Sequence, residues 1–324
     1  MKAILPVLAA AFSLLAPALA GAQAYPSKPV KVIVQFPPGG VPDTYGRIMS
    51  AELSKSWNQP VVVENRTGAS GNIGTDAVAK SAPDGYTLLF AADAPMAISP
   101  ALFAGKLPYD PIKDFAPIIN VCQGGFVLMV HPSVPAHNLK ELVSLVQSQP
   151  KKWAYASSGA GGSQHLAMEM IRSMAGGMDM EHVPYKGFGQ ALADVLSGQV
   201  AMLFGGAAAS VPLIQSGKLR GIAITSPGRS RMLPDLPAVA EALPGYRVMG
   251  WYAFFAPAAT PREIVQKIHA DALATVKRPD FQARALKDNL DPVGSAPEEL
   301  AALLKSDIDM WTKLVKAANT RAEQ

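Results

Sequence analysis

The chain has little of what disulfide-bonded, metal-binding or nucleic-acid-binding proteins need. Cys122 is the only cysteine among 324 residues, so no disulfide forms within the chain, and its apolar neighbours favour a buried thiol. The five histidines show no spacing typical of metal ligands, so neither a metal site nor a cofactor is expected. Charged residues make up only 17% of the chain and its net charge of +4 is scattered, which argues against nucleic-acid binding.

Residues 1–24 have the pattern of a secretory signal peptide. Lys2 precedes an apolar run from Ile4 to Leu19, and Ala22-Gln23-Ala24 is a small-residue cleavage site, so we expect cleavage after Ala24. An uncleaved anchor is the alternative, which the short run and its two prolines disfavour. No later stretch reaches the roughly 20 apolar residues that a membrane span needs. The sequence therefore predicts an exported, soluble protein of the periplasm.

Strand-like runs alternate with helical patterns in the rest of the chain. This alternation predicts an α/β fold with mainly parallel sheets, and about 300 residues suffice for two domains. Two similar strand-to-helix units begin near residues 125 and 250, where we expect the chain to enter and leave the second domain. Asn138–Glu141 has the pattern of a capped helix start, and Thr260–Glu263 that of a capping box.

The most informative stretch is residues 31–43, which read KVIVQFPPGGVPD. A strand pattern runs into Gly39 and Gly40, and a helical pattern opens at Pro42 and Asp43. A helix start behind a glycine turn offers free N–H groups and a positive dipole end to an anion. The alternative is a tight turn that uses glycine only for its conformational freedom.

A second glycine- and serine-rich loop, YASSGAGGSQH at 155–165, also precedes a helix. Anion binding, a structural helix cap and catalysis are all possible there. Catalysis by Ser157, Ser158 or Ser163 is disfavoured, because the nucleophile elbow G-x-S-x-G is missing. His165 on the first helical turn is either a ligand contact or has a local hydrogen-bonding or packing role.

Two further turns of small residues, at 182–189 and 205–209, end strands and precede helices. Lys186 in the first could pair with an anion, although an exposed lysine is commonly only solvated. Phe36, Tyr45, Phe188 and Phe204 could form aromatic walls of a pocket or belong to the core. Loops at the ends of parallel strands are where open α/β folds bind ligands.

Taken together, these stretches resemble the Bug-type solute-binding receptors of tripartite tricarboxylate transporters. The resemblance rests on YPSKPVKVIVQFPPGG-xx-D at 25–43, QPVVVENRTGASGNIG at 59–74, APDGYTLL at 82–89, LPYDPIKDFAPI at 107–118, YASSGAGGSQHL at 155–166, HVPYKG at 182–187 and WYAFFAPAATPREIV at 251–265. These stretches follow one another over essentially the whole mature chain.

The resemblance implies a two-domain periplasmic binding protein fold of type II-like topology, with two crossing hinge strands and a ligand cleft between the lobes. Domain 1 would comprise 25–124 plus 251–324, and domain 2 would comprise 125–250. Hinges are expected near Cys122–Gly125 and Gly250–Tyr252. The first wall of the cleft would be formed by Phe36, Pro38, Gly39, Gly40 and Asp43, and the second by Ser157, Ser158, Gly159, Gly162, Ser163, Tyr185, Lys186, Gly187 and Phe188.

This chain departs from the family pattern at Val41–Tyr45 and at Ala92–Met96, which could reshape the pocket, so the family's ligands do not transfer directly. Asp93 is a further candidate ligand-binding residue. We expect a monomeric, non-enzymatic receptor that captures a small organic carboxylate, aliphatic or aromatic, and delivers it to membrane permease subunits. A ligand sensor for a signalling partner is the alternative within the binding class. A secreted serine hydrolase is the alternative from another class.

Overall fold

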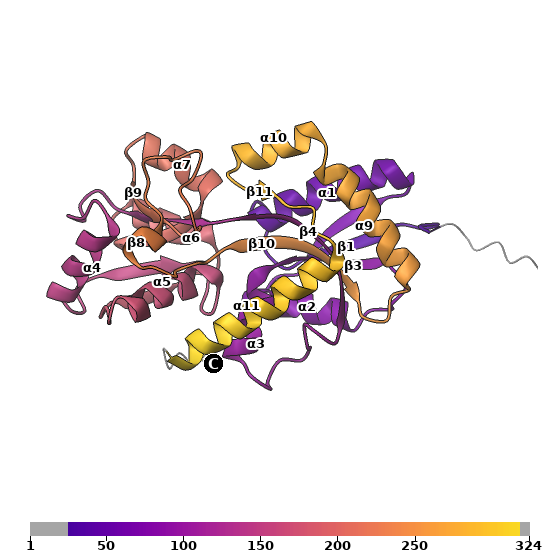
Figure 1. The fold of residues 1–324 in the computed structure, drawn as a ribbon, viewed down its shortest axis with the longest axis horizontal. Helices are drawn as coiled ribbons and strands as arrows, with labels where there is room; N and C mark the ends of the chain where they lie inside the picture. Colours follow the sequence, from indigo (N-terminus) through magenta and orange to yellow (C-terminus); the bar gives the residue numbers. More distant parts are fainter. Residues whose placement is uncertain (1–24, 318–324) are drawn as a thin grey trace, which may run out of the picture.

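The computed structural model describes residues 25–317, and the predicted signal peptide lies outside them. Two β-sheets with flanking helices form two lobes, which lie side by side along the long axis of the molecule (Figure 1). Lobe 1 contains the six-stranded sheet and lobe 2 the five-stranded sheet. The described helices include none that is long and apolar enough to cross a membrane.

The elements follow one another in the alternating order that the sequence predicts. Lobe 1 begins with β1 (Val30–Val34), α1 (Val41–Trp57), β2 (Val61–Asn65), η1 (Ala69–Gly71), α2 (Asn72–Ala79), β3 (Thr87–Ala92), η2 (Ala94–Ile98), α3 (Ser99–Leu102) and β4 (Phe115–Gly124). Lobe 2 has β5 (Phe126–Val130), α4 (Leu139–Ser148), β6 (Ala154–Ser157), α5 (Ser163–Met174), β7 (Glu181–Pro184), α6 (Phe188–Leu196), β8 (Met202–Gly206), α7 (Ala207–Gln215), β9 (Arg220–Ile224) and α8 (Val239–Ala242). The chain returns to lobe 1 with β10 (Gly250–Pro257), α9 (Arg262–Val276), α10 (Pro279–Lys287), β11 (Asp291–Pro292) and α11 (Pro297–Ala317).

Both sheets are mixed, so the expectation of mainly parallel sheets was wrong. The sheet of lobe 1 has the order β11-β4-β10-β3-β1-β2, and that of lobe 2 has the order β7-β6-β8-β5-β9. Strand β1 is parallel to β2 and β3, and β6 is parallel to β7 and β8. The strand that enters each lobe from the other is antiparallel to its neighbours: β10 against β3 and β4, and β5 against β8 and β9.

The chain crosses between the lobes twice. Strand β4 passes directly into β5 through Gly125, and β10 begins at Gly250, which pairs with Gly124. Close packing requires glycine at both crossings, because a Cβ on Gly125 would lie 2.8 Å from Ser226 N and one on Gly250 would lie 2.9 Å from Phe126. The strands of lobe 1 come from 30–124 and 250–292 and those of lobe 2 from 126–224. The predicted domain bounds follow this division and stay a prediction.

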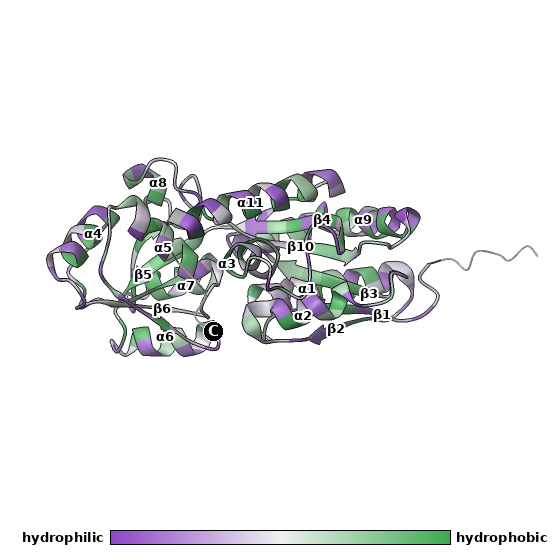
Figure 2. Ribbon diagram, turned by 90° about the horizontal axis from the view of Figure 1, so that it is seen from below, coloured by the Kyte–Doolittle hydropathy of each residue, from purple (hydrophilic) through white to green (hydrophobic). Residues whose placement is uncertain are grey.

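The largest hydrophobic cluster contains residues of both lobes. It includes Leu89 and Trp251 of lobe 1 together with Leu128 and Tyr155 of lobe 2. The central strands are mostly hydrophobic, while hydrophilic residues lie on the outer faces of the helices (Figure 2). Helix α11 packs on η2, β4 and α3. Apolar packing therefore connects the lobes beside the crossing strands, and the loops at the inter-lobe edge are left to form a site.

Candidate functional site

Five α-helices follow parallel strands at the edge that faces the other lobe, and α2 is separated from its strand by η1. Each of α1, α2, α5, α6 and α7 has glycine at its N-cap and no side-chain hydrogen bond at that cap. Helix α4 instead follows the antiparallel strand β5, and there Asn138 Oδ1 accepts the Glu141 N–H at 3.0 Å. The first turn of a helix has N–H groups without intrahelical partners and the positive end of the dipole. The inter-lobe edge thus presents several helix starts that can bind an anion.

The loop between β1 and α1 is held by the carboxylate of Asp43. Asp43 is buried and accepts hydrogen bonds from Gly39 N–H at 3.0 Å, Arg47 Nε–H at 2.9 Å and Asn65 Nδ2–H at 2.9 Å. Burial raises the pKa of Asp43, but the hydrogen bonds outweigh it and hold the pKa below its usual range. Gly39 has φ of +91°, which favours glycine, whereas Gly40 has an ordinary φ of −78°. Asp43 therefore shapes the exposed glycine turn.

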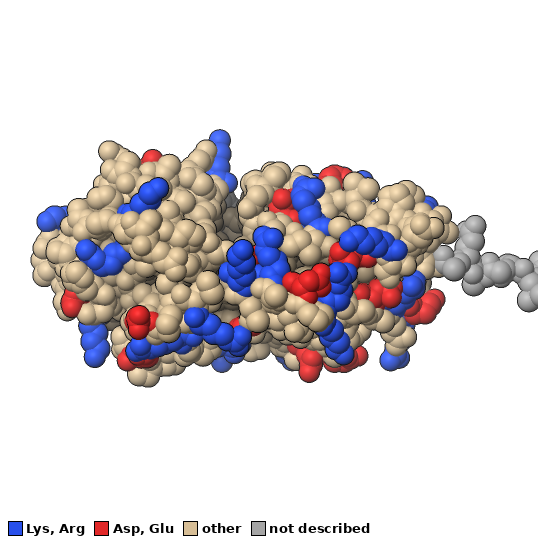
Figure 3. Space-filling view, turned by 90° about the horizontal axis from the view of Figure 1, so that it is seen from above, with Lys and Arg blue, Asp and Glu red and all other residues tan. Residues whose placement is uncertain are grey.

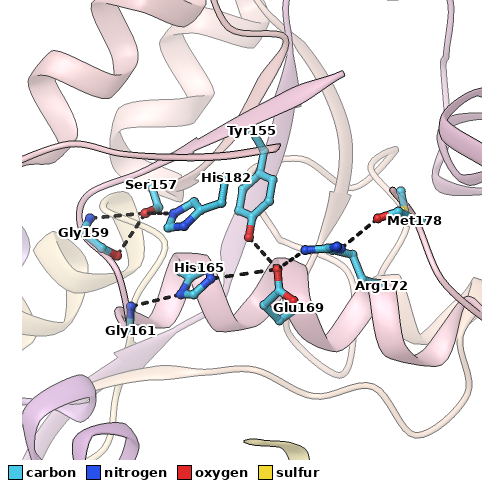
Figure 4. A network of polar contacts seen from close by, with 9 residues as sticks. All are labelled: Tyr155, Ser157, Gly159, Gly161, His165, Glu169, Arg172, Met178 and His182. Carbon is cyan, nitrogen blue, oxygen red and sulfur yellow. Dashed lines mark hydrogen bonds and ion pairs between the residues drawn. The ribbon is translucent and has the colours of Figure 1, made fainter. Parts of the chain in front are cut away.

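In lobe 2 the loop between β6 and α5 is anchored to a stack of three rings (Figure 4). The parallel register of β6 and β7 places His182 beside Tyr155. The ring of His182 stacks on that of Tyr155, with 4.8 Å between centroids, and on that of His165, with 4.0 Å. Gly161 N–H donates to His165 Nδ1 at 3.0 Å, and Ser157 Oγ lies 2.7 Å from His182 Nε2. The two imidazoles thus fix both ends of the loop.

The ring stack is completed by an ion pair on α5. Glu169 Oε1 accepts hydrogen bonds from Tyr155 OH and from Arg172 Nη1, both at 2.6 Å. Burial, together with nearby positive charge, lowers the pKa of His165 and that of His182 to about 4. Both imidazoles are therefore neutral near pH 7 and serve as hydrogen-bond partners of the loop.

The candidate loops of the two lobes touch each other directly. Ser163 Oγ donates to Asp93 Oδ2 at 2.7 Å, and Ser70 Oγ donates to the Ala160 carbonyl at 2.9 Å. Asp93 is only 3% exposed, and burial raises its pKa to about 7 even though Ser163 donates to it. The lobes are closed at these contacts, while the surface is hollowed elsewhere along their join (Figure 3).

The remaining predicted residues differ in their surroundings. Ser158 is exposed, and its N–H and Oγ both donate to Gln164 Oε1. Tyr185 OH donates to Asp194, and Lys186 is exposed, without an ion pair to the described residues. Pro38 is exposed, and the half-buried members are Phe36, Gly159, Gly162, Gly187 and Phe188.

Phe204 packs in the core and does not present its ring at an exposed wall. It is 1% exposed, and it pairs with Leu128 across β8 and β5. Tyr45 is likewise 1% exposed, and its hydroxyl donates to Asp288 at 3.0 Å. Of the four aromatic residues considered for a pocket, these two therefore have packing roles, and Phe36 and Phe188 stay candidates.

Comparison with known proteins identifies the family. Residues 46–320 match the model of the tripartite tricarboxylate transporter family receptors. BugT of Bordetella pertussis is 33% identical to this chain over 302 residues, which are 93% of this chain and 92% of BugT. The chain belongs to the tripartite tricarboxylate transporter family receptors. The resemblance drawn from the sequence motifs is thus confirmed.

Two solved structures similar to this receptor carry ligands. Rpa4515 of R. palustris, solved with adipate, is 32% identical and superposes with a TM-score of 0.85. The superposition covers 91% of this chain and 98% of Rpa4515. MatC of Rhodopseudomonas palustris, solved with malate, is 32% identical with a TM-score of 0.82, covering 90% of this chain and all of MatC. The expected two-lobed fold of periplasmic binding proteins is confirmed by these matches.

The hydrolase alternative finds no support in a family of solute-binding receptors, and the geometry of Ser157 argues against it. Ser157 is 1% exposed, and its hydroxyl donates to the Gly159 carbonyl at 3.0 Å. The proton in the contact with His182 must then come from the imidazole, whereas a nucleophilic serine gives its proton to the histidine. Within residues 25–317, no three His, Cys, Asp or Glu side chains are grouped to hold a metal ion.

Sequence reasoning missed His182, Glu169 and Ser70 as parts of the receptor's inter-lobe loops. His182 is adjacent to the loop only because β7 pairs with β6 in one particular register, and no local motif encodes that register. Ser70 has φ of +54°, a left-handed conformation that serine rarely adopts, so its sequence gave no reason to expect it. The SQHLAME spacing, which puts His165 and Glu169 one turn apart on α5, was the one available signal.

Proposed function

We propose that this chain is a periplasmic receptor that captures a small organic carboxylate and delivers it to the permease of a tripartite tricarboxylate transporter. The observation that carries the proposal is the set of five glycine-capped helix starts at the inter-lobe edge. Glycine at the N-cap leaves the first-turn N–H groups without a competing side chain and lets a ligand approach the backbone. That Rpa4515 was solved with adipate and MatC with malate supports a carboxylate as the ligand.

The charges of the loops agree with this mode of binding. The negative charge of Asp43 is compensated by three hydrogen-bond donors, and the pKa of Asp93 is raised to about 7. Repulsion between these side chains and a bound carboxylate is therefore weakened. Lys186 is the only lysine or arginine among the proposed contacts, and it is exposed. The hydroxyls of Ser157, Ser158 and Ser163 already donate within the protein, so the anion would be held mainly by backbone N–H groups, with Phe36 and Phe188 against its apolar part.

Capture would follow a hinge mechanism in a monomer. A ligand that contacts loops of both lobes binds the closed arrangement better and shifts the population toward it. Hydrogen bonds such as Ser163–Asp93 and Ser70–Ala160 would form on closure and add to ligand contacts. Small-angle scattering should show a smaller radius of gyration when the ligand is saturating. An unchanged radius would count against a closing cleft.

The experiment that tests the function is a thermal-shift screen over aliphatic and aromatic carboxylates that includes adipate and malate, followed by calorimetry. A true ligand at 100 times its Kd stabilises the folded chain by about 2.7 kcal/mol and binds one per chain. No stabilisation by any carboxylate would refute carboxylate capture. Uptake of the labelled ligand by cells with and without the receptor separates transport from signalling, since a sensor would leave uptake intact.

A further inference from the structure

A cavity lies between the lobes at the end of their common edge away from the candidate loops. In the sheet of lobe 1 the candidate loops follow β1, β2 and β3, and β10 and β4 separate them from β11. The cavity has a volume of about 340 Å³ and is lined from lobe 2 by the turn 226–231 and Arg247, and from lobe 1 by residues at the end of α10 and in β11. Ser230 Oγ donates to Asn289 Oδ1 at 2.6 Å and bridges the lobes there. The cavity is thus separate from the proposed carboxylate site.

The lining of this hinge cavity is basic. It contains Arg229, Arg231 and Arg247 but only one acidic residue, Asp291. Arg229 is occupied, because Glu241 accepts from both its Nε–H and its Nη2–H at 2.8 and 2.7 Å. Arg231 is 76% exposed and reaches Asp291 only at 3.9 Å, a weak contact. The guanidinium groups of Arg231 and Arg247 therefore retain donors for a further anion.

Arg247 is exposed and forms no ion pair within residues 25–317. The acidic group that it influences is Asp307: burial raises the pKa of Asp307, and the charge of Arg247 partly offsets this. Asp307 already accepts Trp251 Nε1–H at 2.8 Å. Basic side chains also gather on the surface near the middle of the molecule, where the lobes meet (Figure 3).

The size and the apolar part of the lining indicate what kind of anion fits. Ligand pockets in proteins have volumes of about 300–1,000 Å³, so the hinge cavity can hold a small metabolite. Leu286, Leu290 and Met249 contribute apolar surface beside the arginines. Guanidinium groups donate two parallel hydrogen bonds to a carboxylate, so two of them suit an anion with two or more carboxylates on a short carbon frame.

We propose that the hinge cavity is a second anion site, in which Arg231 and Arg247 bind a small organic polycarboxylate. The site is independent of the glycine-capped helix starts and of the ligand bound there. The probe for its test is citrate, with the neutral polyol xylitol as control. The readout is the rate at which phenylglyoxal modifies each arginine, followed by peptide mass spectrometry, because this rate reports on single residues.

Citrate should slow the modification of Arg231 and Arg247 several-fold, xylitol should not, and the exposed Arg262 on α9 should react at the same rate throughout. The protection should persist in Gly40→Val, whose carboxylate site is expected to be blocked. Equal modification rates with and without citrate would overturn the proposal. So would protection that disappears in Gly40→Val, because it would then arise from lobe closure around the first site.

Calorimetry on paired variants gives a second test. In the Gly40→Val background, Arg231→Ala/Arg247→Ala should weaken citrate binding about tenfold or more. Lys218→Ala/Arg262→Ala removes the same charge from exposed positions outside the cavity and should leave affinity unchanged. Equal weakening in both double variants would mean that net charge alone attracts citrate and would refute a built site.

Discussion

Asp93 offers the sharpest test of the inter-lobe contact, through the replacement Asp93→Asn. The asparagine keeps an acceptor for the Ser163 hydroxyl but cannot ionise. Burial raises the pKa of Asp93 from 3.8 to about 7, and the charge of Asp307 acts in the same direction. Each pKa unit corresponds to about 1.4 kcal/mol, so ionising Asp93 in the closed protein costs on the order of 4 kcal/mol by pH 7. Opening of the lobes hydrates the carboxylate, so the measured loss of folding free energy is smaller than this cost.

The sign of the effect follows from proton linkage. Between about pH 4 and pH 7 the folded protein holds the Asp93 proton and the unfolded chain does not, so the stability of the wild type falls as pH rises through this window. His165 and His182 act in the opposite sense, because their pKa values are lowered to about 4, and their contribution is lost as pH falls. The histidines are common to both proteins, so the difference between wild type and Asp93→Asn isolates Asp93.

Urea unfolding at a series of pH values measures this difference. The free energy of unfolding of Asp93→Asn, relative to wild type, should increase by about 2–4 kcal/mol between about pH 4 and pH 8. Asp179→Asn, at an exposed position, is the matched control and should parallel the wild type. Parallel profiles for wild type and Asp93→Asn would show that Asp93 ionises normally, and the argument from its burial would fail.

Three further predictions concern the ligand loop, the core and the buried thiol. Gly40→Val should fold, because a Cβ there meets Pro42 Cδ at an ordinary 3.6 Å, yet calorimetry should detect no carboxylate binding. Lys186→Ala should lower the affinity for the carboxylate by less than about tenfold, or 1.4 kcal/mol. The reverse result would mean that charge pairing anchors the ligand. Phe254→Ala should lower the free energy of unfolding by about 3–5 kcal/mol, because this fully buried ring packs edge-on against Phe90, and a loss below about 1 kcal/mol would contradict the packing. Cys122 is fully buried and burial raises the pKa of its thiol, so it should react with a disulfide reagent only after unfolding; rapid reaction of the native protein would place it at the surface.

Local patterns predicted the elements well, and Asn138 shows why. Its side chain caps α4 through a bond to a residue three positions away, so the four residues contain the whole interaction. Thr260 was expected to cap α9 in the same way, but the helix begins at Arg262 and Thr260 Oγ1 has no hydrogen-bond partner among the described residues. A proline directly after the threonine placed the cap one residue later than the motif suggests.

The parts of the site that depend on distant pairing were beyond local patterns. Asp43 was proposed as a wall of the cleft, and its main partners turn out to include Asn65 on a neighbouring strand, which makes it a support of the loop. The stack of His165 on His182 requires two strands in one register and a helix laid across them. The proposed ligand contacts themselves stay predictions.

The double crossing of the chain has a consequence for how the protein folds. The sheet of lobe 2 is made from one continuous segment, 126–224, whereas β10, in the middle of the sheet of lobe 1, is made long after β3 and β4. Until residues 250–257 arrive, β3 and β4 each have an unpaired edge where Phe90 and Ile119 later flank Phe254. Open strand edges are sites of mispairing during folding. The strands of lobe 2 can therefore pair as soon as residues 126–224 are made, whereas lobe 1 keeps two open strand edges until β10 follows.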